Sequence, residues 1–251
     1  MKRNDLATYL DDYLRVKAIA DASNNGLQVQ GADEVTRLAF AVDASLAAVQ
    51  GAAEAGAQML VVHHGLFWGK PLMVTGIHHG RLRRLFEADL SLYAAHLPLD
   101  LHEEVGNNAV LARWLGLEEV VPFGEYEGVS VGMAGHLPAT ISLGDFATRV
   151  ESVLQEQIIQ IWPFGSPTVR QVGIVSGGAA FLLDQAAAAG ADVYLTGEVS
   201  HGSYHTAHEL GLNVVFGGHY ATETAGLKAL AGHLAEKFDL ETVFLDLPTG
   251  A

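Results

Sequence analysis

The chain has 251 residues, of which 49% are apolar and 17% are charged, and its formal net charge is -15 at pH 7. It is long enough to bury a full core in one large domain or two small ones, and its composition is that of a globular protein. A surface this acidic repels phosphate backbones, so we do not expect nucleic-acid binding. The absence of cysteine excludes disulfides, thiolate metal sites and cysteine nucleophiles.

The first half of the chain predicts strands that alternate with helices. In chain order these are a helix over 4–20 with Asn4 as its N-cap, a strand over 38–42, a helix over 45–55, a strand over 59–62, a helix over 77–88, a strand over 90–95 and a helix over 105–115. The N-terminal residues lack the apolar core of a signal peptide, and no apolar run approaches the ~20 residues of a membrane span. We therefore expect a cytoplasmic protein with no membrane partner.

Residues 122–128 form a polar, turn-rich stretch that is the best candidate for a domain boundary. We expect one α/β domain over 1–124 and a second over 125–251, unless the C-terminal helix and strand pack back on the first. The elements predicted after the boundary are strands over 129–134, 172–175, 193–195, 212–216 and 242–245 and helices over 143–155, 179–189, 201–210 and 221–238. This alternation predicts an α/β fold with mostly parallel or mixed sheets.

The second half of the chain echoes the first. Aligning the Ala-Gly-Ala triplets at 55–57 and 189–191 places Gly197-Glu198 against His63-His64. In the next strand of each half, two small residues precede a histidine, and a carboxylate follows four positions later. These pairs are His96 with Asp100 and His219 with Glu223. Two intertwined α/β/α repeats related by a pseudo-twofold axis would bring both strand ends to one cleft.

The candidate metal donors all lie at or just after predicted strand ends, and they are His63, His64, His96, Asp100, His219 and Glu223. Neighbouring residues of a regular strand point to opposite faces, so we expect the turn after the strand to aim both adjacent imidazoles at one site. A dinuclear site needs about six to eight donors, or fewer with bridging waters, and a carboxylate is its natural bridge. Nitrogen and oxygen donors favour two divalent ions of zinc, iron, manganese, nickel or cobalt. A lone histidine at a strand end is more often a structural hydrogen bonder, but the matching spacings favour ligands.

A second histidine group, His201, His205 and His208, lies on a predicted helix. It is either a polar helix face or a source of one proton donor or substrate ligand, for which His205 is best placed. Glu198 at a strand end is a candidate base or orienting group. The Gly173-x-x-x-Gly177-Gly178 loop resembles a phosphate-binding loop, but no Gly-Lys-Ser/Thr follows it.

At these residues the chain resembles the Nif-three-like family of dinuclear metal proteins, often labelled GTP cyclohydrolase I type 2 homologues. The motifs that carry the resemblance span nearly the whole chain and are Asn25-Gly26-Leu27-Gln28-Val29, Val62-His63-His64-Gly65-Leu66-Phe67-Trp68, Ala95-His96-x-Pro98-Leu99-Asp100, Val105-Gly106-Asn107-Asn108, Thr196-Gly197-Glu198 and Gly218-His219-Tyr220-Ala221-Thr222-Glu223. The length matches the compact bacterial form.

The resemblance implies a metal site with His63, His64, Asp100, His219 and a bridging Glu223 as ligands. It leaves His96 either as a direct ligand or as a neighbour of the ligands. It also implies a toroidal homohexamer whose sites face an internal cavity.

The residues and the family resemblance are compatible with three functions. The first is a metal-dependent hydrolase that opens the ring of a nucleotide-like small molecule at C8, as on GTP, with Glu198 or His205 moving protons. The second is a metal-binding, metal-delivering or regulatory protein without turnover. A third, a scaffold linked to DNA repair, is disfavoured by the charge of -15.

Overall fold

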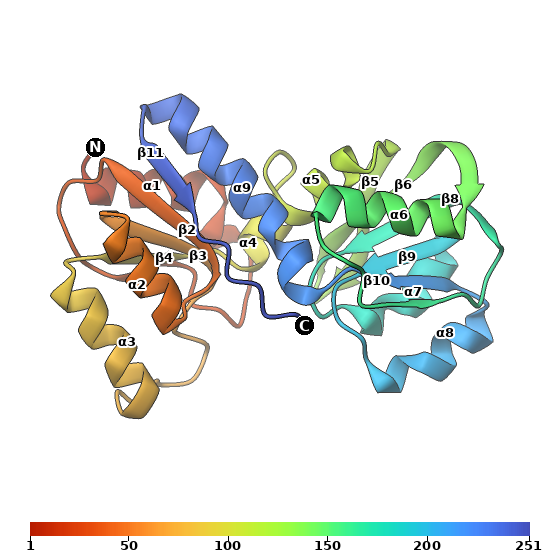
Figure 1. Cartoon of the computed structure of the whole chain (residues 1–251), viewed down its shortest axis with the longest axis horizontal. Coiled ribbons are helices and arrows are strands. Elements are labelled where there is room, and N and C mark those ends of the chain that lie inside the picture. Colours follow the sequence, from red (N-terminus) through yellow and green to blue (C-terminus); the bar gives the residue numbers. More distant parts are fainter. The chain divides into compact units, whose positions relative to one another are not determined.

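The computed structural model describes all residues, 1–251, and they form two compact units. The first unit comprises residues 1–105 and 226–247, and the second comprises 106–225 and 248–251 (Figure 1). Helix α9 (His219–Phe238) begins in the second unit and ends in the first, to which strand β11 (Glu241–Phe244) also belongs. None of the helices combines the length and apolar character needed to cross a membrane.

The sheet of the first unit has the order β1-β4-β3-β2-β11. Its other strands are β1 (Gly26–Val29), β2 (Arg37–Asp43), β3 (Met59–His64) and β4 (Ser91–Ala94). All neighbours are parallel except β1, which runs antiparallel to β4. The predicted strands are confirmed. Strand β1 was not predicted, because its four residues are too few and too mixed in polarity to show a strand pattern.

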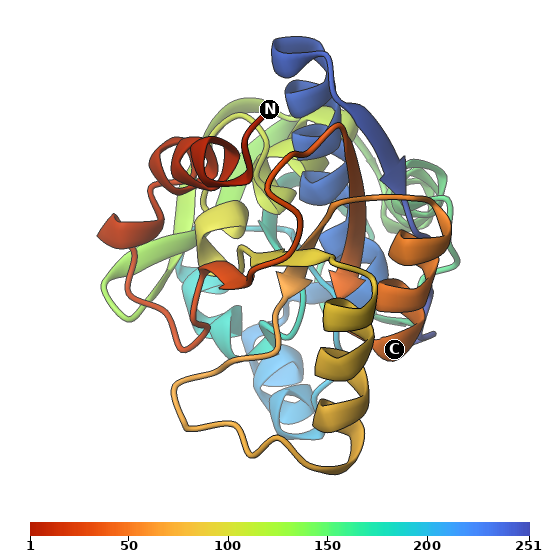
Figure 2. The same ribbon diagram turned by 90° about the vertical axis from the view of Figure 1, so that its left-hand side faces the viewer.

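The helices of the first unit are α1 (Arg3–Tyr13), α2 (Leu46–Glu54), α3 (Gly76–Glu87) and the short α4 (Leu97–Asp100), with a 3₁₀ turn η1 (Val16–Ala18) after α1. Helix α1 ends earlier than predicted because Arg15 adopts a left-handed backbone, and Asn4 lies inside the helix rather than capping it. Helix α2 begins as expected, with the Ser45 side chain accepting a hydrogen bond from the Ala48 amide. Helices α2 and α3 pack side by side (Figure 2).

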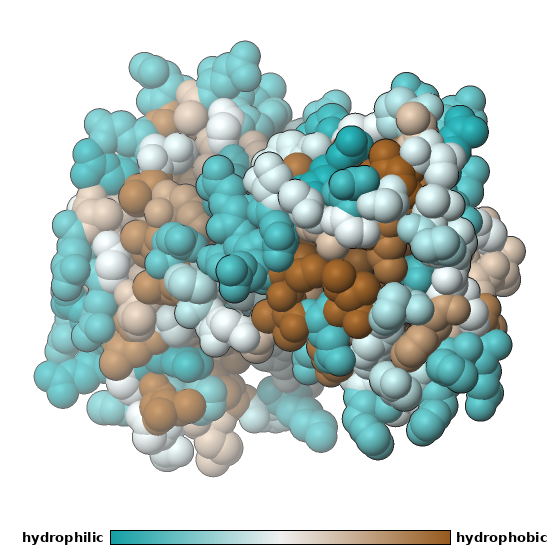
Figure 3. Space-filling view, turned by 45° about the vertical axis from the view of Figure 1, so that its right-hand side comes forward, coloured by the Kyte–Doolittle hydropathy of each residue, from teal (hydrophilic) through white to brown (hydrophobic).

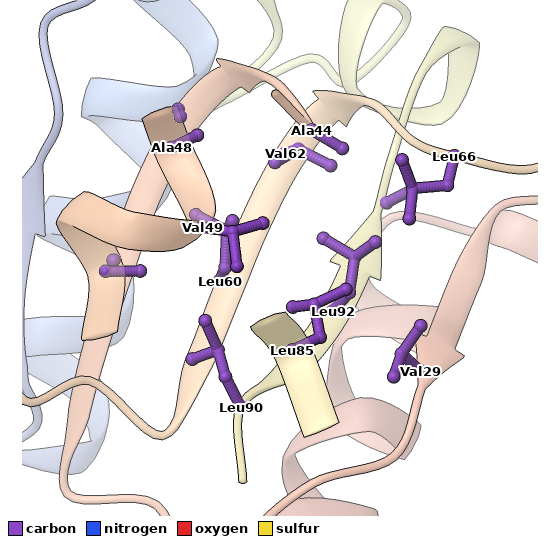
Figure 4. Close-up of a cluster of buried hydrophobic side chains, with 14 of the residues drawn as sticks. Val29, Ala44, Ala48, Val49, Leu60, Val62, Leu66, Leu85, Leu90 and Leu92 are labelled. Carbon is purple, nitrogen blue, oxygen red and sulfur yellow. The ribbon is translucent and has the colours of Figure 1, made fainter. Parts of the chain in front are cut away.

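The core beneath α2 and α3 takes alternate residues from each strand (Figure 4). Leu60 and Val62 of β3 and Leu92 of β4 lie with Val49 of α2 and Leu85 of α3 in this buried cluster. The central residues of β2, β3 and β4 that point the other way are buried as well, so these parallel strands read as continuous apolar runs. This double-sided burial holds the carboxyl end of β3, where the histidine pair lies, in one position.

The second unit is built on a mixed sheet of order β5-β6-β8-β9-β10-β7. Its strands are β5 (Glu118–Tyr126), β6 (Val129–Ser142), β7 (Gln160–Trp162), β8 (Thr168–Val175), β9 (Val193–Thr196) and β10 (Asn213–Phe216). Its helices are α5 (Asn107–Trp114), α6 (Leu143–Leu154), α7 (Leu183–Ala188) and α8 (Tyr204–Leu210), with 3₁₀ turns η2 (Ala180–Leu182) and η3 (His201–Ser203). Strands β8, β9 and β10 are parallel, whereas β5, β6 and β7 are antiparallel to their neighbours. The mixed α/β fold with two mixed sheets is thus confirmed.

The turn-rich stretch over 122–128 lies within the second unit, not between the two. It forms the end of β5 and the tight turn into β6, since these strands pair from Glu118 opposite His136 to Tyr126 opposite Val129. Helix α5, before the predicted boundary, packs on β6. The polar residues that suggested a linker therefore belong to a hairpin whose edge strand faces solvent.

The repeat seen in the sequence has a counterpart in the topology. The order β1-β2-α2-β3-α3-β4 matches β7-β8-α7-β9-α8-β10, with β3 and β9 central in each parallel trio. Met59 and Val193 occupy equivalent register positions in the two repeats, so His63-His64 and Gly197-Glu198 are equivalent positions as well. The next strands differ by one residue, because Ser91 matches Asn213 and His96 therefore matches Gly218 rather than His219. His96 and His219 thus share the four-residue spacing to a carboxylate, but they do not occupy equivalent positions in the two repeats.

An aromatic stack joins the end of α9 to α1 within the first unit. The ring of Tyr13 lies parallel to that of His233 with centroids 4.3 Å apart, and His102 packs on Tyr13 at 4.4 Å. The Tyr9 hydroxyl lies 2.5 Å from Nε2 of His233. Burial lowers the pKa of both His102 and His233 below the ordinary value of 6.5, so both rings are neutral in the folded stack.

This stack predicts a loss of stability in mild acid. Unfolded histidines take up protons below about pH 6.5, whereas the folded His102 and His233 resist protonation, so stability is full above that pH and falls as the pH drops. His233→Phe keeps an aromatic ring and removes the titrating group, so its Tm should depend less on pH between about 7.5 and 5 in calorimetry. His79→Phe, at an exposed position on α3, is the control and should keep the wild-type slope. Equal slopes for wild type and His233→Phe would contradict the prediction.

Candidate metal centre

Three histidines gather at the carboxyl end of the sheet in the first unit. His63 and His64 end β3, and His96 follows β4, the parallel neighbour of β3. The ring centroid of His63 lies 4.7 Å from that of His64 and 5.0 Å from that of His96, and the other two rings are 5.6 Å apart. One nitrogen from each ring lies within 4.8 Å of the others, the arrangement of a group able to hold a metal ion.

The histidine pair lies inside the strand, contrary to the expectation that a turn after the strand would aim it. Strand β3 continues through His64, which pairs in register with Asp43 of β2. The two rings converge nonetheless, tilted by 47° to one another. No further strand residues lie beyond His64. The two imidazoles can therefore lean past the carboxyl end of the sheet toward each other.

Each of these imidazoles has its Nδ1 against an oxygen from another segment. For His63 the oxygen is the backbone carbonyl of Ala95 at 3.0 Å. For His64 it is Oδ1 of Asp43 at 2.9 Å. His96 faces Oδ1 of Asp21 at 3.0 Å. An oxygen acceptor places the ring proton on Nδ1 and the lone pair on Nε2, which is the way in which metal-binding histidines are held.

Asp21 is not among the site residues predicted from the sequence. Its nearly buried carboxylate accepts hydrogen bonds from His96, from the Asn25 side chain at 2.8 Å and from the Leu97 amide at 3.0 Å. Burial alone would raise its pKa, but the hydrogen bonds from His96 and Asn25 outweigh burial and lower the pKa to about 2. Asp21 is therefore a fixed anion at neutral pH. It lies in an irregular segment 75 residues before His96, where no strand or helix pattern points to it.

Asp100 lies at the end of α4, where it is buried beside the histidines. Its Oδ2 is 3.5 Å from Nε2 of His63, itself fully buried. A buried carboxylate facing the nitrogen that would carry a lone pair is a stable arrangement when a cation or a proton is shared between them. The structure thus brings Asp100 to the histidine group as the sequence predicts.

The second unit holds a donor pair, His219 and Glu223, one helical turn apart at the start of α9. Nε2 of His219 lies 3.1 Å from Oε1 of the buried Glu223, and Nδ1 lies 3.0 Å from Oε2 of Glu198. The hydrogen bond to Glu223 raises the pKa of His219 most, burial opposes it, and the charges of Glu223 and Glu198 add to the rise, which brings the pKa to about 9. In one respect His219 repeats the pattern of the first unit, because its Nδ1 faces an oxygen of another segment, Oε2 of Glu198.

The glycines after β8 and β9 make room for this pair. Gly177 has a left-handed backbone with φ of +66°, and a Cβ atom there would overlap Oε1 of Glu223. A Cβ atom on Gly197 would lie 2.7 Å from Cα of His219. The loop that resembled a phosphate cradle in the sequence thus admits the Glu223 carboxylate instead, and Gly197 admits the start of α9.

The other histidine group stays on the surface of the second unit. His201 lies in η3, and His205 and His208 lie on α8, all exposed. The ring contacts of His205 and His208 are with Tyr204 at 5.5 Å and Phe164 at 4.9 Å. The structure therefore places Glu198, but not His205, in contact with a candidate ligand.

The donors in both units are imidazoles and carboxylates, a set that suits divalent ions such as zinc, iron, manganese, nickel and cobalt. In each unit the imidazoles are oriented by oxygen partners and the candidate carboxylates are buried. This chemistry fits a metal centre. A bound cation would also offset the cost of placing charged groups at the ends of buried strands.

Known proteins are similar to this chain over nearly its whole length. A family model described as Duf34/NIF3 (NGG1p interacting factor 3) matches residues 1–250. A relative from Deinococcus radiodurans named GTP cyclohydrolase 1 type 2 homolog is 49% identical over 248 residues, which cover 99% of this chain and 94% of the relative. The crystal structure of TTHA1606 from Thermus thermophilus is similar with a TM-score of 0.91 at 46% identity. A protein called ybgI, described as of unknown function, has a TM-score of 0.94 at 37% identity, and both alignments cover 100% of each chain.

The glycine cradle gives a direct test of the second donor pair. Gly177→Ala is expected to displace the Glu223 carboxylate and to weaken metal binding by about 10- to 100-fold, the range for changes that disturb ligand orientation. The left-handed backbone adds a stability cost of about 1–2 kcal/mol. Metal affinity by competition with a chelating dye and stability by urea unfolding measure the two effects.

Gly190→Ala is the matched control. Its φ is +76°, and a Cβ atom there meets nothing within 4 Å, so the backbone strain is similar without the contact. It should lose similar stability but keep the metal. A Gly177→Ala protein that binds metal as well as Gly190→Ala would show that Glu223 is not a ligand.

Proposed function

The chain belongs to the Duf34/NIF3 family, and on that basis we propose that it holds two divalent metal ions per subunit and acts as a metal-dependent hydrolase. The proposed ligands are His63, His64, Asp100, His219 and a bridging Glu223, with His96 as a further donor. The family resemblance implies that these donors belong to one dinuclear centre. The metal is one of iron, zinc, manganese, nickel and cobalt.

One observation carries the proposal. His63, His64, His96 and His219 each have Nδ1 against an oxygen of another segment, at distances of 2.9 to 3.0 Å. Structural histidines use either ring nitrogen for such contacts, whereas ligand histidines are held in one tautomer by their outer partner. Four histidines with the same orientation support ligation of metal ions through Nε2.

The proposed substrate is a nucleotide-like small molecule, and the proposed reaction is ring-opening hydrolysis at C8 of a purine such as that of GTP. Support comes from the name shared by the relatives. Metal ions bound to such donors act as Lewis acids and make water more acidic. Glu198 holds His219 in place and is 58% exposed at its side chain, so it can exchange protons with solvent. Because His205 contacts no candidate ligand, Glu198 is the better candidate for moving protons during the reaction.

The test combines metal analysis with a turnover assay. Wild-type protein purified without chelators should contain about two equivalents of metal and should open GTP, as followed by ultraviolet absorbance and by mass spectrometry of the product. Glu223→Gln preserves the shape of the side chain and should lower metal affinity at least about tenfold, with turnover falling in parallel. His79→Gln, at the exposed position on α3, should change neither. Fully metal-loaded protein that turns over neither GTP nor generic phosphoesters and amides would overturn the hydrolase proposal.

A second candidate function is metal delivery or regulation without turnover. It is favoured by the partial exposure of the donor side chains, which is 21% for His64, 23% for His96 and 30% for His219. A delivery protein would release its metal to a competing chelator within minutes, whereas an enzyme would retain it through many turnovers. The exchange rate of radioactive zinc, measured in the same preparations, separates the two functions.

We further propose a toroidal homohexamer, as the family resemblance implies. Large apolar side chains are exposed on and before α3, among them Met73, Ile77 and Phe86. The face drawn in Figure 3 also carries apolar areas, shown in brown among teal hydrophilic residues. Such exposed apolar groups are typical of surfaces that are covered in an assembly. Native mass spectrometry is expected to find six chains. A monomer at micromolar concentration would contradict the proposal.

A further inference from the structure

The indole of Trp68 lies beside the three histidines of the first unit. Its ring centroid is 5.1 Å from that of His96, in an edge-to-face contact at 71°, and 6.1 Å from that of His64. The side chain remains 36% exposed. A large aromatic surface therefore adjoins two candidate ligands and is open to solvent.

The backbone around Trp68 is fixed on both sides. Trp68 forms an isolated β-bridge with Ser23, and the amide of Gly69 donates to the carbonyl of Ala22 at 2.8 Å. The segment that holds it is the one that supplies Asp21 and Asn25 to His96. Trp68 and His96 are thus positioned by the same stretch of chain, so the distance between the two rings is set by one short segment.

The indole N–H is already used within the loop. Nε1 of Trp68 donates to the carbonyl of Gly65 at 2.9 Å. What the exposed part of the ring offers to a ligand is therefore aromatic carbon rather than a hydrogen-bond donor. A planar group that stacked on this exposed face would remove aromatic carbon from water, and such contacts between rings are favourable.

We propose that Trp68 is the surface on which the planar heteroaromatic ring of the substrate stacks, with a purine base as the chemical class. The choice of a purine nucleotide as substrate rests on the proposed function, whereas the stacking contact rests on the position of the Trp68 ring. Stacking of a base on an aromatic side chain tolerates many rings, because every base has a π face. Trp68 would thus hold the base of a nucleotide beside His64 and His96, and these two metal-ligand candidates would not have to contact the base.

The experiment measures binding of GTP, guanosine and ribose 5-phosphate by calorimetry, on both metal-loaded and metal-free protein. Trp68→Ala should weaken guanosine and GTP binding about 5- to 150-fold, the range that corresponds to loss of one stacked base. Trp68→Phe should retain most of the affinity. Ribose 5-phosphate binding and metal content should not change in either variant. Trp114→Ala removes another exposed indole, 41% exposed on α5, and should bind all three ligands like wild type.

Several results would overturn the assignment. Unchanged guanosine affinity in Trp68→Ala, or wild-type protein that binds neither guanosine nor GTP, would exclude stacking. Loss of metal from Trp68→Ala and Trp68→Phe alike would show that the indole is a structural cover for His96. The hydrolase proposal fails separately, because wild-type protein that binds GTP through Trp68 without converting it would exclude the reaction and leave the stacking role intact.

Discussion

The candidate site depends on one repeated interaction, the hydrogen bond between Nδ1 of an imidazole and an oxygen from another segment. Ala95, Asp43, Asp21 and Glu198 supply those oxygens, and each belongs to a different part of the chain. A histidine ring has two nitrogens and rotates freely in a flexible setting, so its orientation must be imposed from outside. The fold meets this requirement by placing strand ends and loops around the rings, and the burial of the sheet keeps those strand ends fixed.

The parallel strands and most helices were predictable from sequence because their causes are local. A strand buried on both faces, such as Met59 to Val62, must be apolar throughout, and Ser45 and Ser142 mark helix starts through their own side chains. Strands β1, β5 and β7 were not predicted, since they are edge strands whose exposed faces carry polar residues. Their assignment depends on pairing with a neighbour that is distant in sequence.

The candidate site was predictable to a similar depth. Residues that carry metal chemistry are identifiable by type and by position at or after a strand end, as His63, His64 and Asp100 are. The residues that orient them are not, because Asp21 acts through an irregular loop and Gly177 acts by the absence of a side chain. The one-residue offset between His96 and His219 was likewise hidden, since sequence spacing alone does not distinguish a shared register from a shared motif.

Helix α9 and strand β11 give the chain an unusual order of assembly during synthesis. The first unit precedes the second along the chain, yet its sheet lacks β11 until residues 241–244 have been made, as the pairing of Arg37 with Glu241 across 204 positions requires. The second unit has nearly all its residues in one continuous segment and is free to fold before that. The unit made first is therefore the unit finished last. Until then, the buried strand β2 is an open sheet edge on a nascent chain, a state in which apolar edges are prone to pair with the wrong partner.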